Sequence, residues 1–350
     1  SVPIEIAVQR LIAPTQSPSL LAIPFFILLG TLMSYTGIAE RILHIANVLV
    51  GKMRGGLGVA NILVSTMMGG VSASNLADAA MLSRMMVPEM ERKGYNRAFA
   101  AAITAGGSLV TPIIPPGIAL IIYGLVADVS IGKMFIAGLV PGLLCAVVLM
   151  FTVYLVARKT NAKPSRESWP TGKEVVFSLG QAWPALFLIF AVVGGIRANI
   201  FTPTEAGAAA VLSVLAIGFF IYREMRISHV VKALGETARA TASVMLVIMA
   251  SAALGWIFSM EHAGVAVANF VTSLTENKYM FLLIINILLL TLGMFLEGNA
   301  ILLILVPLLK PVVEHFGIDP VHFGIIMIFN LSIGAFTPPV GTVMLLVCNI

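Results

Sequence analysis

The chain has 350 residues, of which 59% are hydrophobic and only 11% are charged, and its mean hydropathy is +1.01. Soluble domains carry roughly 25% charged residues, so this composition excludes a soluble globular protein. The formal net charge of +5 could indicate nucleic-acid binding, but the basic residues are distributed by membrane side, as described below. Because the apolar segments are uniformly apolar and do not alternate as barrel strands do, we predict a polytopic all-α membrane protein.

The apolar segments occur in a defined order along the chain. The predicted crossings are 18–38, 97–127, 131–158, 180–198, 203–222, 241–260 and 320–350. Two further apolar blocks, 56–93 and 279–316, contain Gly, Ser or Asn near their middle, so we expect each to be a re-entrant helical hairpin. The last residues, GTVMLLVCNI, stop within a span, so we expect the natural chain to continue beyond one or both ends.

Charge placement orients these crossings. If both blocks enter and leave on one side, that side collects fourteen basic residues and the other side collects four. The fourteen are Lys52, Arg54, Arg92, Lys93, Arg97, Arg158, Lys159, Lys163, Arg166, Lys173, Arg223, Arg226, Lys232 and Arg239, and the four are Lys133, Arg197, Lys278 and Lys310. The positive-inside rule makes the first side cytoplasmic. The basic segment 222–240 is then expected to be a separate helix lying at the cytoplasmic interface.

The two halves of the chain are related by a shift of 223 residues without a gap. The resulting identities include Gly70 with Gly293, Leu82 with Leu305, Pro88 with Pro311, Gly94 with Gly317, Ile103 with Ile326, and Pro115-Pro116 with Pro338-Pro339, and five of these seven pairs are Gly or Pro. The parity of the crossings makes the two repeats inverted. Inverted repeats are typical of secondary transporters that bind their substrate near the middle of the membrane.

Prolines interrupt the same crossing in each repeat, in the stretches TPIIPPG (111–117) and TPPVG (337–341). Proline removes an N–H donor and disfavours the helical turn before it, so both crossings should unwind and expose backbone carbonyls. Such a break survives in a membrane only where protein, water or an ion satisfies these groups. We therefore predict a discontinuous transmembrane helix in each repeat.

The two hairpin tips carry polar residues. These are Ser72, Ser74 and Asn75 in the first tip, and Glu297, Gly298 and Asn299 in the second. Asp78 stands three residues after Asn75, as in a capping box at the start of the returning helix. The helix N-termini favour an anion, and the oxygens and freed carbonyls favour a small cation. We infer one cation site per repeat with an anionic substrate between them.

Three stretches carry a family resemblance: 69–124, TPTEAGAAAV (202–211) and 317–345. They resemble the large membrane (M) subunit of the tripartite ATP-independent periplasmic (TRAP) transporters, within the ion-transporter superfamily, and the resemblance extends over essentially all 350 residues. It implies an elevator-type Na⁺ symporter in the bacterial inner membrane. It also implies two partners, a small four-helix membrane subunit (Q) and a periplasmic substrate-binding protein (P).

The resemblance also implies the ion and substrate ligands. The expected Na⁺ sites, about two in number, comprise Ser72, Ser74, Asn75, Gly107, Thr111 and Pro112 in the first repeat, and Glu297, Gly298, Asn299, Gly334, Thr337 and Pro338 in the second. The expected substrate contacts are Ser74, Asp78, Ser108, Asn299, Asn330 and Thr337. The division of the chain would be a first repeat with N-terminal segments (1–158), a cytoplasmic linker (159–178), scaffold and interfacial helices (179–240) and a second repeat (241–350).

The sequence therefore predicts Na⁺-coupled import of an organic acid anion, of the sialic acid or C4-dicarboxylate type. One alternative is a stand-alone Na⁺/dicarboxylate or other anion transporter that works without a binding protein. A channel or an intramembrane enzyme is the other alternative. An enzyme would need a nucleophile and a base, and the sequence contains no such intramembrane constellation. A channel would tend to have rings of residues made by oligomeric symmetry, whereas the symmetry here is internal.

Overall fold

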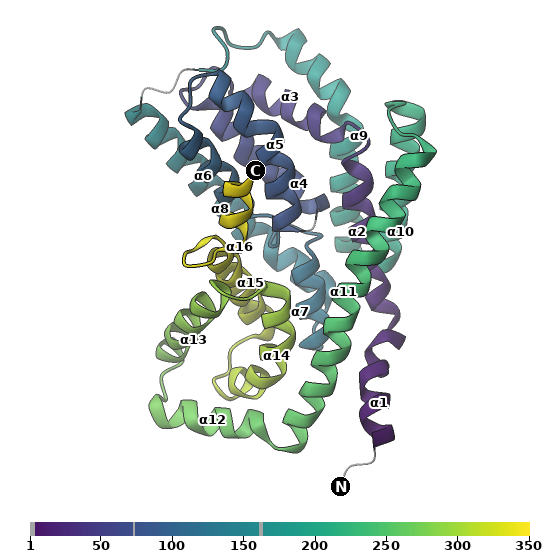
Figure 1. Ribbon diagram of the computed structural model, residues 1–350, viewed down its shortest axis with the longest axis vertical. Helices are drawn as coiled ribbons and strands as arrows, with labels where there is room; N and C mark the ends of the chain where they lie inside the picture. Colours follow the sequence, from purple (N-terminus) through teal and green to yellow (C-terminus); the bar gives the residue numbers. More distant parts are fainter. Residues whose placement is uncertain (1–3, 73, 161–163) are drawn as a thin grey trace.

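The computed structural model of the protein describes residues 4–72, 74–160 and 164–350, and every regular element in these ranges is a helix (Figure 1). Five helical segments in this part of the chain are long and apolar enough to cross a membrane, and two bent helix pairs raise the number to seven if each is one span. The prediction of a polytopic all-α protein is confirmed.

The first repeat contains four helices that follow the predicted hairpin and broken crossing. Their bounds are α4 Gly56–Ser72, α5 Asn75–Arg92, α6 Arg97–Gly107 and α7 Ile118–Val126. Helices α4 and α5 pack together as a hairpin, and residues 108–117 between α6 and α7 are not helical. We call residues 108–117 the first break; it contains the TPIIPPG stretch, where proline chemistry predicts it.

The second repeat has the same sequence of elements. Its helices are α13 Lys278–Gly293, α14 Gly298–His315, α15 Pro320–Phe336 and α16 Thr342–Asn349. Adding 223 to the bounds of α5 gives those of α14, and adding it to the first residue of α6 gives that of α15. Residues 337–341 form the second break, and Pro115-Pro116 and Pro338-Pro339 each have a cis peptide bond. These bounds agree with the repeat; its inversion across the membrane stays a prediction.

Equivalent capping residues begin the broken crossings. Asn96 accepts from a backbone N–H in the first turn of α6, and Asp319, 223 residues later, does the same for α15. Such side-chain caps satisfy N–H groups that have no partner within the helix. The turn before each cap contains a glycine with positive φ, Gly94 at +85° and Gly317 at +61°. The sequence thus ends each hairpin and restarts each crossing in the same way.

The two repeats interlock through their last helices. Helix α7 of the first repeat packs against α14 and α15, whereas α16 of the second packs against α5 and α6. The phenolic hydroxyl of Tyr123 in α7 donates to the backbone oxygen of Pro320 in α15 across 2.7 Å. Figure 1 shows α16 between its sequence neighbour α15 and the helices of the first repeat. Hairpins and broken crossings therefore form one packed unit.

The remaining helices flank this unit. They are α1 Ile4–Ile12, α2 Ala22–Met33, α3 Ile38–Val50, α8 Ile131–Lys159, α9 Gly172–Arg197, α10 Pro203–Ala216, α11 Ile227–Met260 and α12 Ala263–Leu274, with 3-10 turns at Ala13–Gln16 and Pro18–Leu21 and a π-helical turn at Ile217–Ile221. Helix α10 begins with a capping box between Thr202 and Glu205 and has Pro203 in its first turn, where a proline is well tolerated. Helix α9 begins inside the predicted linker, and residues 161–163 of that linker lie outside the described residues.

Helix α11 corrects one prediction. Segment 222–240 was expected to be a separate interfacial helix followed by a crossing at 241–260, but Ile227–Met260 is one continuous helix of 34 residues. The sequence ALGETARATAS (233–243) contains no proline and several strong helix formers, so nothing ends the helix there. At 1.5 Å per residue α11 is about 50 Å long. It runs along one side of the molecule beside α2 (Figure 1).

The sequence prediction also missed α1, α3 and α12. Helix α3 buries Ile38, Ile42 and Ile45 and carries polar residues between them, so its 13 residues are amphipathic and did not resemble a crossing. Helix α12 is likewise short, with 12 residues, and meets α13 at a bend of 115°. Short amphipathic helices that pack on a membrane protein lack the long apolar run by which crossings are identified.

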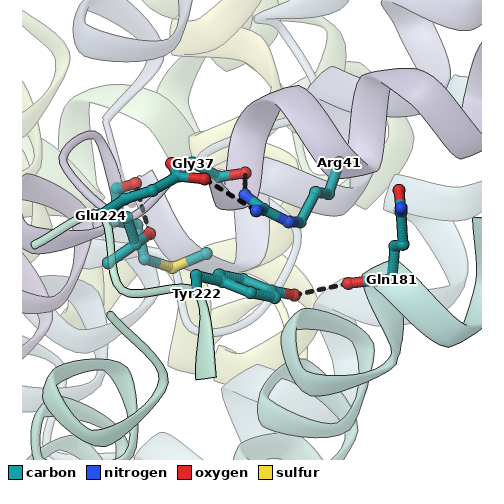
Figure 2. A network of polar contacts seen from close by, with 7 residues as sticks. Gly37, Arg41, Gln181, Tyr222 and Glu224 are labelled. Atoms are coloured by element: carbon teal, nitrogen blue, oxygen red, sulfur yellow. Dashed lines mark hydrogen bonds and ion pairs between the residues drawn. The ribbon is translucent and has the colours of Figure 1, made fainter. Parts of the chain in front are cut away.

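A polar network joins α3 to α9 and to the segment after α10 (Figure 2). The guanidinium of Arg41 pairs with Glu224 Oε1 at 2.7 Å and lies 3.8 Å from the centre of the Tyr222 ring. Tyr222 donates to the backbone oxygen of Gln181 across 2.7 Å, and Arg41 donates to that of Gly37 across 2.8 Å. Three segments far apart in the sequence are therefore fixed to one another.

Candidate functional site

A cavity of about 450 Å³ lies where the two hairpin tips meet helices α2 and α11; we call it the main cavity. Ser74 and Asn75 line it at the start of α5, and Glu297, Gly298 and Asn299 line it at the start of α14. The positive ends of two helix dipoles therefore meet at one cavity. This is the arrangement that the sequence predicts for an anion.

At the first tip, Ser74 is the N-cap of α5. Its hydroxyl oxygen accepts from the backbone N–H of Ala77 at 3.4 Å, and the Asn75 side-chain oxygen accepts from Leu76 N at 2.9 Å. The expected capping-box pairing of Asn75 with Asp78 is therefore wrong. Helix α5 begins one residue earlier than that pairing requires, and the Asp78 carboxylate points to the interior instead.

The second tip is capped by a carboxylate. Glu297 Oε2 accepts from the backbone N–H of Ala300 at 3.0 Å, and Glu297 Oε1 accepts from the Asn299 side-chain amide at 2.8 Å. A negative side chain at a helix N-terminus is favoured by the helix dipole. Because the Asn299 side-chain nitrogen donates to Glu297, the orientation of the whole Asn299 amide, including its oxygen, is fixed by a hydrogen bond within the tip.

Asp78 is buried and links three elements of the first repeat. Its Oδ2 atom accepts from Ser65 of α4 at 2.7 Å and from Thr111 of the first break at 3.1 Å. Its Oδ1 atom has no hydrogen-bond partner among the described residues. Buried polar groups are usually paired, so this oxygen marks a place where a further polar group or ion would be favourable. The sequence prediction missed Ser65, which lies in an apolar run.

The first break is packed tightly against the first hairpin. A Cβ atom at Gly69 would lie 3.0 Å from the Thr111 Cα atom, so a larger residue would push the break away from α4. Gly107 ends α6, and Ser108 donates to Ala105 O at 2.8 Å. Pro112 lines the main cavity. The break is thus held by protein on the hairpin side and open to the cavity on the other.

The second break is also joined to its hairpin. The backbone N–H of Gly341 donates to Met294 O at 3.2 Å, and a Cβ atom at Gly334 would lie only 2.7 Å from the Gly293 Cα atom. Thr337 caps the end of α15, where its hydroxyl donates to Ile333 O at 2.7 Å. Unlike the first break, the second is exposed at Pro338.

The predicted residues divide into two groups by their relation to the main cavity. Those that line it are Ser74, Asn75, Pro112, Glu297, Gly298 and Asn299. Those outside its lining are Asp78, Gly107, Ser108, Thr111, Asn330, Gly334, Thr337 and Pro338. Asn330 is buried in α15 and donates to Asn286 of α13. Ser72 ends α4, and its side chain lies outside the described residues.

Helices α2 and α11 supply cavity residues that the sequence prediction missed. These are Thr31 and Ser34 of α2 and Glu236 of α11. Tyr35 donates to Glu236 Oε1 at 3.3 Å and so holds this carboxylate toward α2. These polar residues on largely apolar segments could have been recognised as candidates for a binding site. Nothing local in the sequence, however, indicates that α2 and α11 lie opposite the tips.

The charged residues that line the main cavity are both acidic. Within the described ranges they are Glu236 and Glu297, and none of the lining residues is Lys, Arg or His. The same ranges contain no cluster of three or more His, Cys, Asp or Glu side chains that could hold a metal ion. An anion in this cavity would therefore be met by helix N-termini, hydroxyls and amides rather than by a basic side chain.

An all-helical fold in which two hairpin tips and two broken helices meet at a cavity defines a membrane transport protein. The family model of the tripartite ATP-independent periplasmic transporter, DctM component, matches residues 1–350. The chain therefore belongs to the family of TRAP transporter large permeases, which are multi-pass proteins of the inner membrane and not enzymes. The resemblance inferred from the sequence is confirmed.

Individual relatives are similar over nearly the whole chain. The sialic acid TRAP transporter large permease SiaM of Vibrio cholerae is 40% identical over 99% of this chain and 81% of its own length. The C4-dicarboxylate TRAP transporter large permease DctM of Pseudomonas aeruginosa is 39% identical over 95% of this chain and 77% of its own length. The crystal structure of the Alcanivorax borkumensis YdaH transporter superposes with a TM-score of 0.66 at 14% identity, covering 99% of this chain and 80% of that chain, and shows a shared fold.

Proposed function

We propose that this permease imports an organic acid anion together with Na⁺. The observation that carries the proposal is the main cavity, where the N-termini of α5 and α14 meet and no described lining residue is basic. Helix N-termini attract a carboxylate but supply only about half a positive charge each. Co-bound cations would supply the remaining charge, which makes anion binding depend on the cation.

Oxygen atoms near the cavity support Na⁺ as that cation. Small hard cations prefer hydroxyl, amide, carboxylate and carbonyl oxygens. The first tip and first break offer Ser74, Asn75 and the carbonyls around Pro112, and the second tip offers Glu297 and Asn299. We assign one Na⁺ to each repeat, with Thr111 and Thr337 as the break residues of the two sites.

The charge balance gives the transport a driving force. Two Na⁺ ions with a monovalent acid carry one net positive charge inward, and each charge moved through 100 mV is worth about 2.3 kcal/mol. We propose an elevator movement in which the hairpins and broken crossings travel together against α9, α10 and α11. The reciprocal packing of α7 on α14 and of α16 on α5 favours such a unit.

The relatives suggest substrate and partners. Two permeases of similar sequence are named for sialic acid and C4-dicarboxylates, and the family description is that of a tripartite, periplasmic system. We therefore propose an organic acid as substrate, a periplasmic binding protein that delivers it and a small membrane subunit beside the permease. A stand-alone exchanger of the same superfamily would need no binding protein.

Reconstitution tests the proposal. The full-length permease and its small subunit are placed in proteoliposomes, the binding protein is added outside, and uptake of radiolabelled sialic acid or succinate is followed. We expect uptake with an inward Na⁺ gradient and none when choline replaces Na⁺. Uptake that continues without Na⁺ would overturn the coupling, and Na⁺-driven uptake without the binding protein would favour the stand-alone alternative.

A further inference from the structure

We propose that the α2–α11 wall of the main cavity selects hydroxylated monocarboxylates over dicarboxylates. The polar residues of this wall are Thr31, Ser34 and Glu236, and they stand among the apolar lining residues of the same two segments. The inference rests on the proposed function, because it names the class of anion that the same cavity accepts. It separates the two substrate types suggested by the relatives.

The two hydroxyls of this wall are available only as acceptors. Thr31 donates its hydroxyl hydrogen to Ile27 O at 2.9 Å, and Ser34 donates its own to Thr31 O at 2.7 Å. A hydroxyl has one hydrogen and two lone pairs, so each oxygen that faces the cavity can still accept but has no hydrogen left to donate.

Glu236 adds a third acceptor, and this one is a carboxylate. It receives one hydrogen bond, from Tyr35 at 3.3 Å, and takes part in none of the ion pairs of the described residues. Lys232, one turn earlier on α11, lies 5.8 Å from the centre of the Tyr35 ring and is absent from the cavity lining. In the part of the chain that the structure describes, no basic side chain therefore forms an ion pair with Glu236.

The two sides of the cavity consequently suit different chemical groups. The tips present the N-termini of α5 and α14, where the backbone N–H groups that are not already bound by Ser74, Asn75 and Glu297 can bind a carboxylate. The three polar side chains of the α2–α11 wall are acceptors, which bind hydroxyl donors and disfavour a second carboxylate. A molecule with one carboxylate and several hydroxyls satisfies both sides, whereas a C4-dicarboxylate places its second charge against Glu236.

Binding to the solubilised complex tests this directly. The full-length permease with its small subunit is purified in detergent with saturating NaCl, and gluconate and succinate are titrated while the thermal unfolding midpoint is followed. We expect half-maximal stabilisation at a roughly tenfold lower concentration of gluconate than of succinate. Equal concentrations for the two probes would overturn the proposal without touching Na⁺ coupling, whereas loss of Na⁺-dependent binding for both would instead contradict the proposed function.

Four variants separate the effect of the Glu236 charge from a structural effect. Glu236→Gln should reduce the preference for gluconate by about tenfold, and Glu236→Asp should keep it, because like charges held close together are costly to each other. Glu261→Gln, the same change at the exposed end of α11, is the matched control and should leave the preference unchanged. Ser34 is exposed, so Ser34→Ala provides the test if Glu236→Gln fails to fold. It should weaken the binding of gluconate and leave the binding of succinate unchanged. An unchanged ratio in both Glu236→Gln and Ser34→Ala would overturn the proposal.

Discussion

Thr111 of the first break donates to Asp78 of α5 across 3.1 Å, at a position where both side chains are completely buried. The same carboxylate oxygen accepts from Ser65 of α4 at 2.7 Å. One acid thus connects both helices of the first hairpin to the unwound crossing. Intramembrane acids are costly and are usually functional, so this junction is where ion binding and hairpin position would be coupled.

The first prediction concerns Thr111. Thr111→Val keeps the shape of the side chain and removes the hydroxyl, which leaves Asp78 short of one hydrogen bond at a cost of about 1–2 kcal/mol. We expect the Na⁺ concentration for half-maximal uptake to rise about tenfold. Thr111→Ser restores the donor and should remain near the wild type. Unchanged Na⁺ dependence in Thr111→Val would remove Thr111 from the ion site.

The second prediction concerns the N-cap of α14. Glu297→Ala removes the acceptor for Ala300 N and the partner of Asn299, and the lost cap should cost about 1 kcal/mol. Ser130→Ala removes the cap of α8, which lies outside the cavity, and is the matched control. Both variants should lower the thermal unfolding midpoint to a similar degree. Only Glu297→Ala should raise the Na⁺ requirement of uptake; a similar rise in Ser130→Ala would contradict a local role.

Much of this architecture follows from backbone chemistry that is visible in the sequence. Pro112 and Pro115-Pro116 cannot continue a helix, and α6 does end before them. Ser74 is a preferred N-cap residue and Glu297 places a carboxylate at the positive end of α14, and both returning helices begin directly after these residues. These features are local, so one sequence suffices to place them.

Features that depend on packing could not be predicted in this way. The carboxylate of Asp78 could have capped its own helix, and only the approach of α4 and the first break shows that Ser65 and Thr111 are its partners. Similarly, Glu236 stands among polar residues at the start of α11, and its place in the cavity arises from the packing of α11 on α2. The sequence shows which side chains are polar or charged, but tertiary contacts decide which groups these side chains pair with.

The third prediction concerns the close contact of α13 with α15. A Cβ atom at Gly334 would lie 2.7 Å from Gly293 Cα, whereas one at Gly106 of α6 would meet nothing within 4 Å. Gly334→Ala must separate two backbones and should abolish most transport, in the manner of overpacked cores that lose roughly 1–3 kcal/mol. Gly106→Ala should be neutral or slightly stabilising, because alanine favours a helix by up to about 1 kcal/mol. Uptake and the unfolding midpoint measure both effects, and equal behaviour of the two variants would contradict the contact.

The last prediction separates backbone strain from a side-chain clash at two glycines. Gly37 and Gly94 both have positive φ, +68° and +85°, so alanine at either should cost about 1–2 kcal/mol. At Gly94 a Cβ atom meets nothing within 4 Å, whereas at Gly37 it would lie 1.9 Å from Glu224 Oε2 and 2.5 Å from Arg41 Nη1.

Gly37→Ala must therefore also displace the ion pair that joins α3 to the segment after α10. We expect Gly37→Ala to lower the thermal unfolding midpoint clearly more than Gly94→Ala. The Na⁺ dependence of the remaining uptake should stay that of the wild type, because neither glycine lines the main cavity. The double variant Gly37→Ala with Glu224→Ala should recover part of the loss, since the shortened side chain no longer occupies the space that the new methyl group needs. Equal midpoints for Gly37→Ala and Gly94→Ala would contradict the clash. They would show that Gly37→Ala destabilises the protein through backbone strain only, and that the Arg41–Glu224 pair moves aside without loss of stability.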